Sequence, residues 1–122
     1  MTGQELRVES ERLESCRVLR LVGELDLATV EILDQHIAGF AADAGPSQLV
    51  VDLTALEFMD STGLKSLLRA SEQFPGRVAL VAPSFAVRRL LDVTGLDSHF
   101  PQFPDVESAR AFLDPESTST EA

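Results

Sequence analysis

The stretch LVVDLTALEFMDSTGL, residues 49–64, decides the fold of this 122-residue chain. Its first five residues are apolar except for one aspartate, which is typical of a central strand buried on both faces of a sheet. Beyond Asp60-Ser61-Thr62-Gly63 the leucines recur at helical spacing, so a helix begins there. The stretch therefore predicts a buried strand that leads into a helix through a junction containing two adjacent hydroxyls.

The same alternation of strand and helix continues on both sides of this stretch. Residues 6–9 and 17–23 are expected to be strands, and the short charged turn between them predicts an antiparallel hairpin. Strands that alternate with helices imply parallel pairing with helical crossovers. The remaining expected elements are a helix carrying apolar residues 30–40, a helix through residues 64–74, a strand over 77–82, a helix from 83 to 95, an extended piece over 97–103 and a helix over 105–113.

These elements predict the α/β fold class, as a single domain over residues 1–114. We expect a mixed sheet of about four to five strands with an N-terminal antiparallel hairpin, and about four helices. Hydrophobic residues make up 44% of the chain, which suffices for one core without a disulfide or metal. Residues 115–122 are polar and low in complexity, so we expect them to form a disordered tail.

Composition excludes several classes of partner. The net charge of −10 disfavours nucleic acid and anionic membranes, because both attract Lys and Arg. The single cysteine, Cys16, is expected to be a small structural thiol, and a chain without internal disulfides fits a reducing compartment. The sequence shows neither a signal peptide nor a transmembrane segment, so we expect a cytoplasmic protein. No cofactor is expected.

Enzymatic readings of the sequence are weak. A serine hydrolase would need His36 or His99 as a base beside Ser61, and the chain lacks the Gly-x-Ser-x-Gly elbow of α/β hydrolases. One cysteine and two separated histidines make a poor metal-ligand set, and no phosphate-binding loop is present. We therefore expect a protein that is not an enzyme, with the Ser61 hydrolase kept as an alternative.

The junction itself allows a simple structural interpretation. Asp60 or Ser61 can cap the exposed N–H groups of the helix, with the Ser61 hydroxyl pointing outward. Capping does not explain Gly63, which is unfavourable in a first helical turn; we interpret it as flattening the surface for a partner's backbone. Asp26 follows another apolar strand and is expected at the same sheet edge, with Thr29 just inside the following helix.

Three segments resemble a known family: RLVGELDLATV (20–30), LVVDLTALEFMDSTGL (49–64) and VRRLLDVTGLDSHF (87–100). They are similar to the STAS-domain anti-sigma factor antagonists of bacteria, over roughly residues 6–113. Members of that family switch partners to regulate transcription in stress responses and sporulation. The unphosphorylated antagonist binds an anti-sigma factor that is a serine kinase of the GHKL type, and the sigma factor is released.

The resemblance also implies roles for individual residues. Ser61 matches the serine that the kinase phosphorylates to end binding, and a PP2C-type phosphatase would restore it. The protein would be a monomer or weak dimer. The alternative within the family is a scaffold or ligand-sensing STAS protein of a stress-signalling complex, without a phosphoswitch. The residues expected to bind the partner are Asp26, Thr29, Asp60, Ser61, Thr62, Gly63, Leu64 and Lys65.

Overall fold

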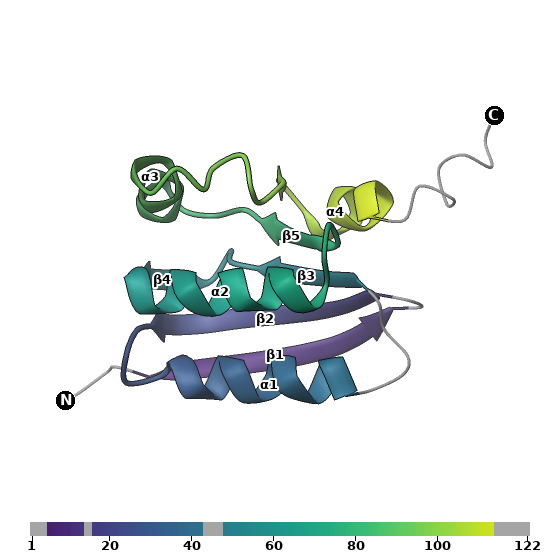
Figure 1. The fold of residues 1–122 in the computed structure, drawn as a ribbon, viewed down its shortest axis with the longest axis horizontal. Helices are drawn as coiled ribbons and strands as arrows, with labels where there is room; N and C mark the ends of the chain where they lie inside the picture. The colour runs from purple at the N-terminus through teal and green to yellow at the C-terminus, as the bar shows by residue number, and fades with distance from the viewer. Residues whose placement is uncertain (1–4, 14–15, 43–47, 114–122) are drawn as a thin grey trace.

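The computed structural model describes residues 5–13, 16–42 and 48–113, which contain six strands and four helices (Figure 1). The predicted tail and the predicted end of the first helix near residues 43–46 lie outside these residues. In chain order the elements are β1 (Leu6–Leu13), β2 (Cys16–Leu25), α1 (Val30–Ala42), β3 (Gln48–Asp52), β4 (Leu56–Met59), α2 (Ser61–Gln73), β5 (Val78–Val81), α3 (Phe85–Val93), β6 (Gln102–Phe103) and α4 (Val106–Leu113).

One mixed sheet joins all six strands and confirms the predicted fold class. Its order is β1-β2-β3-β5-β6, and β4 pairs with the end of β2, beyond the residues of β2 that pair with β3. The β1–β2 pair is the predicted antiparallel hairpin, and the other pairs are parallel. Because β2, β3, β4 and β5 run in the same direction, their carboxyl ends share one edge of the sheet. The loops leading into α1, α2 and α3 follow that edge (Figure 1).

Alternate residues of the central strands face two different hydrophobic layers. In β3, Leu49 and Val51 belong to the larger cluster, which contains side chains of α1, α2 and α3. Val50, between them, belongs to a smaller cluster with Ala109 and Leu113 of α4. Both strand faces are therefore covered, which explains why the sequence of β3 is an almost unbroken apolar run.

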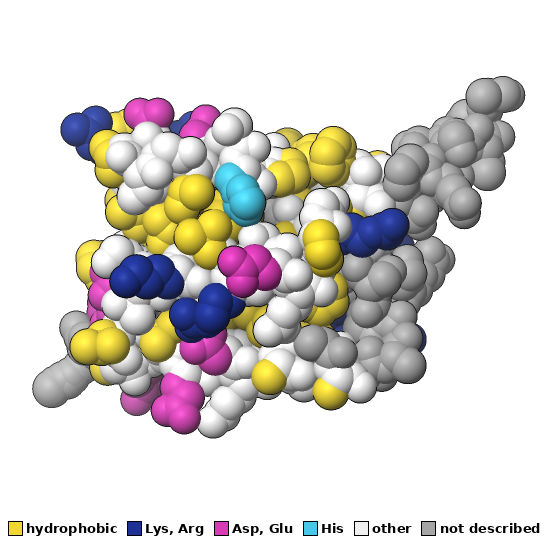
Figure 2. Space-filling view, in the orientation of Figure 1, with side chains coloured by type: hydrophobic (Ala, Val, Ile, Leu, Met, Phe, Trp, Pro, Cys, Tyr) yellow, Lys and Arg dark blue, Asp and Glu magenta, His cyan; other side chains and the backbone are white. Residues whose placement is uncertain are grey.

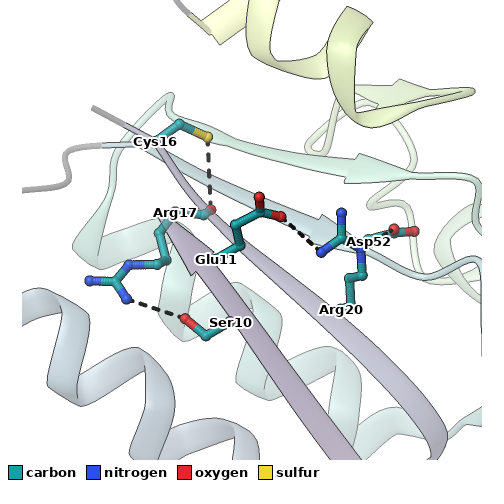
Figure 3. A network of polar contacts seen from close by, with 6 residues as sticks. All are labelled: Ser10, Glu11, Cys16, Arg17, Arg20 and Asp52. Atoms are coloured by element: carbon teal, nitrogen blue, oxygen red, sulfur yellow. Dashed lines mark hydrogen bonds and ion pairs between the residues drawn. The ribbon is translucent and has the colours of Figure 1, made fainter. Parts of the chain in front are cut away.

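Toward the β1 edge of the sheet, two arginines of β2 replace apolar packing with polar contacts (Figure 3). Arg20 forms ion pairs with Glu11 of β1 at 3.1 Å and with Asp52 of β3 at 3.5 Å. Arg17 donates a hydrogen bond to Ser10 at 3.2 Å, and its guanidinium carbon lies 4.3 Å from the centre of the Phe40 ring. The edge strand is β1, and its own charged side chains, such as Glu11, discourage pairing with another chain.

Three predictions about local structure need correction. Residues 10–13, which were expected in the turn, continue strand β1 because they pair with β2. Between the predicted buried strand and the helix that follows it, the structure contains a further short strand, β4, that was not predicted. Of the extended piece at 97–103, only Gln102–Phe103 pairs in the sheet; a turn closed by a hydrogen bond from His99 N–H to Leu96 C=O precedes it.

Local hydrogen bonds set the start of the last two helices. Ser84, predicted to begin the third helix, is the N-cap of α3 and accepts a hydrogen bond from the Val87 amide at 3.2 Å. Asp105 lies immediately before α4. The Ser108 backbone amide and then its hydroxyl donate to the carboxylate, and these bonds hold the pKa of Asp105 below its ordinary value. The three-residue spacing of each pair is that of an N-cap.

The packing predicts that shortening a buried side chain in β5 lowers the free energy of unfolding. Leu80 is fully buried in the larger cluster, so Leu80→Ala should lower the free energy of unfolding by about 2–5 kcal/mol through lost transfer energy and a residual cavity. Val93→Ala, at a side chain that is 68% exposed, is the control and should change it by less than about 0.5 kcal/mol. Urea denaturation measures both; similar losses for the two variants would contradict this packing.

Candidate functional site

Asp60 connects the end of β4 to the first turn of α2. Its backbone is extended, and its Oδ1 accepts hydrogen bonds from the backbone amides of Thr62 at 2.9 Å and Gly63 at 3.1 Å. Its carbonyl accepts the first intrahelical bond, from Leu64 N–H at 3.1 Å. Asp60 is therefore the N-cap of α2, and of the two capping residues that the sequence allowed, the structure selects Asp60 over Ser61.

A single backbone hydrogen bond places the β2–α1 loop beside this junction. Leu25 pairs with Met59 in the parallel β2–β4 ladder, and the Asp60 N–H donates to the Leu25 carbonyl at 3.2 Å. The chain therefore leaves both strands at neighbouring positions, at Asp26 on one side and Asp60 on the other. The prediction that Asp26 lies at the same edge of the sheet as the junction at residues 60–63 is confirmed.

Asp26 and Thr29 hold their loop in place through reciprocal hydrogen bonds. The Asp26 carboxylate accepts from the amides of Ala28 at 3.1 Å and Thr29 at 3.2 Å. The Thr29 hydroxyl accepts from Asp26 N–H at 3.0 Å and donates to the Glu24 carbonyl at 2.8 Å. Thr29 precedes α1 rather than lying inside it, and it is only 4% exposed. Its hydroxyl is therefore used inside the protein.

The interpretation of Gly63 as an opening for a partner's backbone is wrong. Gly63 is buried, and a Cβ at this position would lie 2.7 Å from Leu25 Cγ and 2.9 Å from Met59 Cγ. A glycine is needed because α2 packs directly on the ends of β2 and β4. Leu64, also expected at a partner interface, is 3% exposed and belongs to the larger cluster, so its side chain faces the core.

The side chains that remain on the surface of this junction are few. Ser61 is exposed at the first position of α2, as predicted, and no described residue hydrogen-bonds its hydroxyl. Lys65, one turn further along, is also exposed, while Thr62 is half-buried. On the neighbouring loop, Leu27 is 77% exposed. This leucine was not predicted as a site residue, because its exposure depends on the loop geometry.

A polar contact that was not predicted from the sequence holds the body of α2 against α1. Asp34 of α1 accepts a hydrogen bond from the Ser66 hydroxyl. It also forms an ion pair with Arg69, with a nitrogen–oxygen distance of 3.0 Å. Ser66 is fully buried. Figure 2 shows Lys or Arg and Asp or Glu side chains side by side over these helices. The three-residue spacing of Ser66 and Arg69 places both on one face of the helix, but only the fold shows that Asp34 lies opposite them.

Neither histidine forms a catalytic pair with Ser61. His99 Nε2 lies 3.1 Å from the hydroxyl of Ser71, which is ten residues beyond Ser61 and hence about 15 Å further along the helix. His36 Nδ1 lies 2.9 Å from the Ile32 carbonyl of its own helix. A base must lie within hydrogen-bonding distance of the serine that it activates, so these contacts give no support to the hydrolase alternative.

Within residues 5–13, 16–42 and 48–113, no three His, Cys, Asp or Glu side chains are grouped where they could hold a metal ion. None of the helices in these ranges combines the length and the apolar character needed to cross a lipid bilayer.

The fold and this junction define a class of protein. The model of the STAS domain family matches residues 7–109, and the chain therefore belongs to the STAS-domain family. The chain is 39% identical over 94 residues to the anti-sigma-F factor antagonist RsfB of Mycobacterium tuberculosis, covering 75% of this chain and 76% of RsfB.

Solved structures support the same placement. A crystal structure of an anti-sigma factor antagonist from Mycobacterium paratuberculosis superposes with a TM-score of 0.83 at 33% identity, covering 92% of this chain and 97% of that one. The anti-sigma factor antagonist SpoIIAA in its unphosphorylated form gives 0.77 at 26% identity, covering 90% and 96%. SpoIIAA of Bacillus in the phosphorylated form gives 0.69 at 25% identity, covering 88% and 98%.

The close packing at Gly63 leads to a prediction about stability. Gly63→Ala should lower the free energy of unfolding by about 1–3 kcal/mol, because the added methyl group overpacks Leu25 and Met59. Gly39→Ala is the matched control, since a Cβ there meets no atom within 4 Å, and alanine in a helix interior should add up to about 1 kcal/mol. Denaturant unfolding measures both, and a gain in stability at both positions would refute the packing argument.

The cap predicts a different pattern at Asp60. Asp60→Ala should cost about 1 kcal/mol because the amides of Thr62 and Gly63 lose their acceptor, whereas Asp60→Asn should stay close to wild type, since asparagine caps helices as well as aspartate does. Thermal unfolding followed by circular dichroism compares the two variants. If Asp60→Asn were as unstable as Asp60→Ala, the negative charge rather than the hydrogen-bond acceptor would be stabilising α2.

Proposed function

We propose that this protein is an anti-sigma factor antagonist controlled by phosphorylation of Ser61. In its unphosphorylated form it binds a serine-kinase anti-sigma factor of the GHKL type, and the sigma factor is released. Phosphorylated Ser61 ends that binding, and a PP2C-type phosphatase restores it. The proposal is supported by the similarity to proteins named as anti-sigma factor antagonists and by one observation in this chain.

That observation is the position of the Ser61 hydroxyl. Ser61 is exposed at the first position of a helix whose N-terminus is already capped by Asp60. The hydroxyl makes no hydrogen bond to the described residues, so the fold does not depend on it. A kinase can therefore approach and modify it without first breaking an internal contact.

The transfer itself requires chemistry that the kinase supplies. The Ser61 oxygen would attack the γ-phosphorus of ATP, the bond from that phosphorus to the bridging oxygen would break, and ADP would leave. The hydroxyl proton would pass to a base of the kinase. This chain contributes an exposed nucleophile on a rigid helix end, and Leu27 on the neighbouring loop adds exposed apolar surface for the partner.

The added charge explains how binding would end while the fold survives. A phosphate carries about −1.5 to −2 charges, and its repulsion from Asp60 is on the order of 1–4 kcal/mol per unit charge at contact distance. In the free protein, water solvates the exposed phosphate. In the complex, water is displaced, and burying a net negative charge there costs several kcal/mol. A loss of about 2.7 kcal/mol already weakens binding a hundredfold.

The alternative is a scaffold or ligand-sensing STAS protein in which no residue at the α2 N-terminus is phosphorylated. It shares the fold and the Asp60 cap, and it differs only in the chemistry at Ser61. Incubation with ATP and the candidate kinases therefore separates the two functions. Binding without phosphate transfer would favour the scaffold.

The proposal predicts the behaviour of three variants. Ser61→Ala should abolish phosphorylation and bind the kinase persistently, and Ser61→Glu should keep its melting temperature but bind at least tenfold more weakly, because the carboxylate introduces a negative charge into the interface. Thr62→Ala, which removes the adjacent hydroxyl, should still accept one phosphate. Mass spectrometry locates the phosphate, circular dichroism reports the fold, and calorimetry gives the affinities.

Two results would contradict this assignment. A phosphate found on Thr62 or within residues 117–120 of wild type would move the acceptor elsewhere. Wild-type affinity of a folded Ser61→Glu variant would exclude local charge as the switch.

A further inference from the structure

Lys65 is the cationic residue nearest to Ser61 on helix α2. Residues four apart on a helix are neighbours on its surface, with Cβ atoms about 5–6 Å apart. Lys65 is exposed and forms no ion pair with any described residue. The next cation on this helix, Arg69, is already bound to Asp34 of α1 at 3.0 Å. A free ammonium group therefore lies one turn from the candidate phosphoacceptor.

The backbone of the same helix end cannot easily hold a phosphate. Phosphates at helix N-termini are usually bound by the free amides of the first turn. Here the Asp60 carboxylate already occupies the amides of Thr62 and Gly63, at 2.9 and 3.1 Å. A phosphate on Ser61 would have to displace that carboxylate or find a cation on a side chain.

The other charged groups of the junction oppose a phosphate. Asp60 is adjacent in sequence, Asp26 starts the neighbouring loop, and Glu57 lies on the exposed side of β4. All three are acidic, and Lys65 is the cation closest to Ser61 along α2. An acidic group four residues before a lysine is also the more favourable orientation of a helical ion pair.

We propose that Lys65 is the intramolecular counterion of phosphorylated Ser61. This inference rests on the proposed function, because it needs a phosphate on Ser61. Phosphorylation would then alter the surface twice: it adds a dianion at the helix start, and it withdraws the Lys65 ammonium from groups on the kinase. The pair would also offset the repulsion from Asp60 in the free protein.

The test needs no kinase. Phosphoserine is incorporated at position 61 during translation, and the second ionisation of the phosphate is followed by phosphorus NMR at low salt. With Lys65 present, the midpoint should lie about 0.2–0.4 pH units lower than in Lys65→Gln, the shift expected from a helical ion pair. Lys65→Arg should restore the low midpoint. At 1 M salt the difference should shrink, since screening acts over about 3 Å there.

Arg77→Gln is the matched control. It removes the same charge from another exposed cation that has no ion pair among the described residues, at the opposite edge of the sheet, before β5. Its midpoint should equal that of the unsubstituted phosphoprotein. Equal midpoints for Lys65→Gln and the unsubstituted phosphoprotein, or equal shifts for Lys65→Gln and Arg77→Gln, would overturn the inference. Absence of Ser61 phosphorylation by a kinase would instead refute the proposed function, so the two failures are distinguishable.

Discussion

Helix α2 packs so closely on the ends of β2 and β4 that position 63 has no space for a methyl group. The contact of Gly63 with Leu25 and Met59, together with the hydrogen bond from Asp60 N–H to the Leu25 carbonyl, fixes where the helix begins. Because the helix start is fixed, Ser61 occupies its first position and its side chain lies outside the core. The same contacts bring the β2–α1 loop alongside, so the candidate site is a direct consequence of this packing.

Hydrogen bonds within the two loops make the site rigid. Asp60 satisfies two amides of α2, and Asp26 with Thr29 forms a comparable set of bonds before α1. Further along, Asp34 ties α1 to α2 through Ser66 and Arg69. Ser61 is therefore exposed beside Asp60, Asp26 and Thr29, whose side chains already have hydrogen-bond partners within the protein. A change at its hydroxyl can alter an interface without removing an interaction that the fold needs.

The charged residues that flank Ser61 along the chain are Asp60 and Lys65. The histidines hydrogen-bond elsewhere, His99 to Ser71 and His36 to the Ile32 carbonyl. The acidic residues around Ser61 would repel a phosphate, and the positive charge of Lys65 would partly offset that repulsion. Membership in the STAS-domain family and the names of the relatives agree with a regulatory role, and the proposed switch uses only groups that this junction presents.

The sequence by itself determined the features that depend on near neighbours. The alternating and helical periodicities predicted the α/β class, the hairpin and most helices. The sequence also limited the N-cap of α2 to Asp60 or Ser61, because capping hydrogen bonds span only two or three residues. Asp26 and Ser61 could likewise be identified as candidate site residues, because each follows an apolar strand in the sequence.

Only the tertiary structure decided the features that join distant segments. Strand β4 has four residues, and its register shift against β2 interrupts the alternation by which strands are recognised. The need for glycine at 63 comes from Leu25 and Met59, and the burial of Thr29 and Leu64 comes from helices packing on the sheet. The partner of Ser66 is an aspartate on another helix. No periodicity encodes such contacts, because they depend on how separate elements meet.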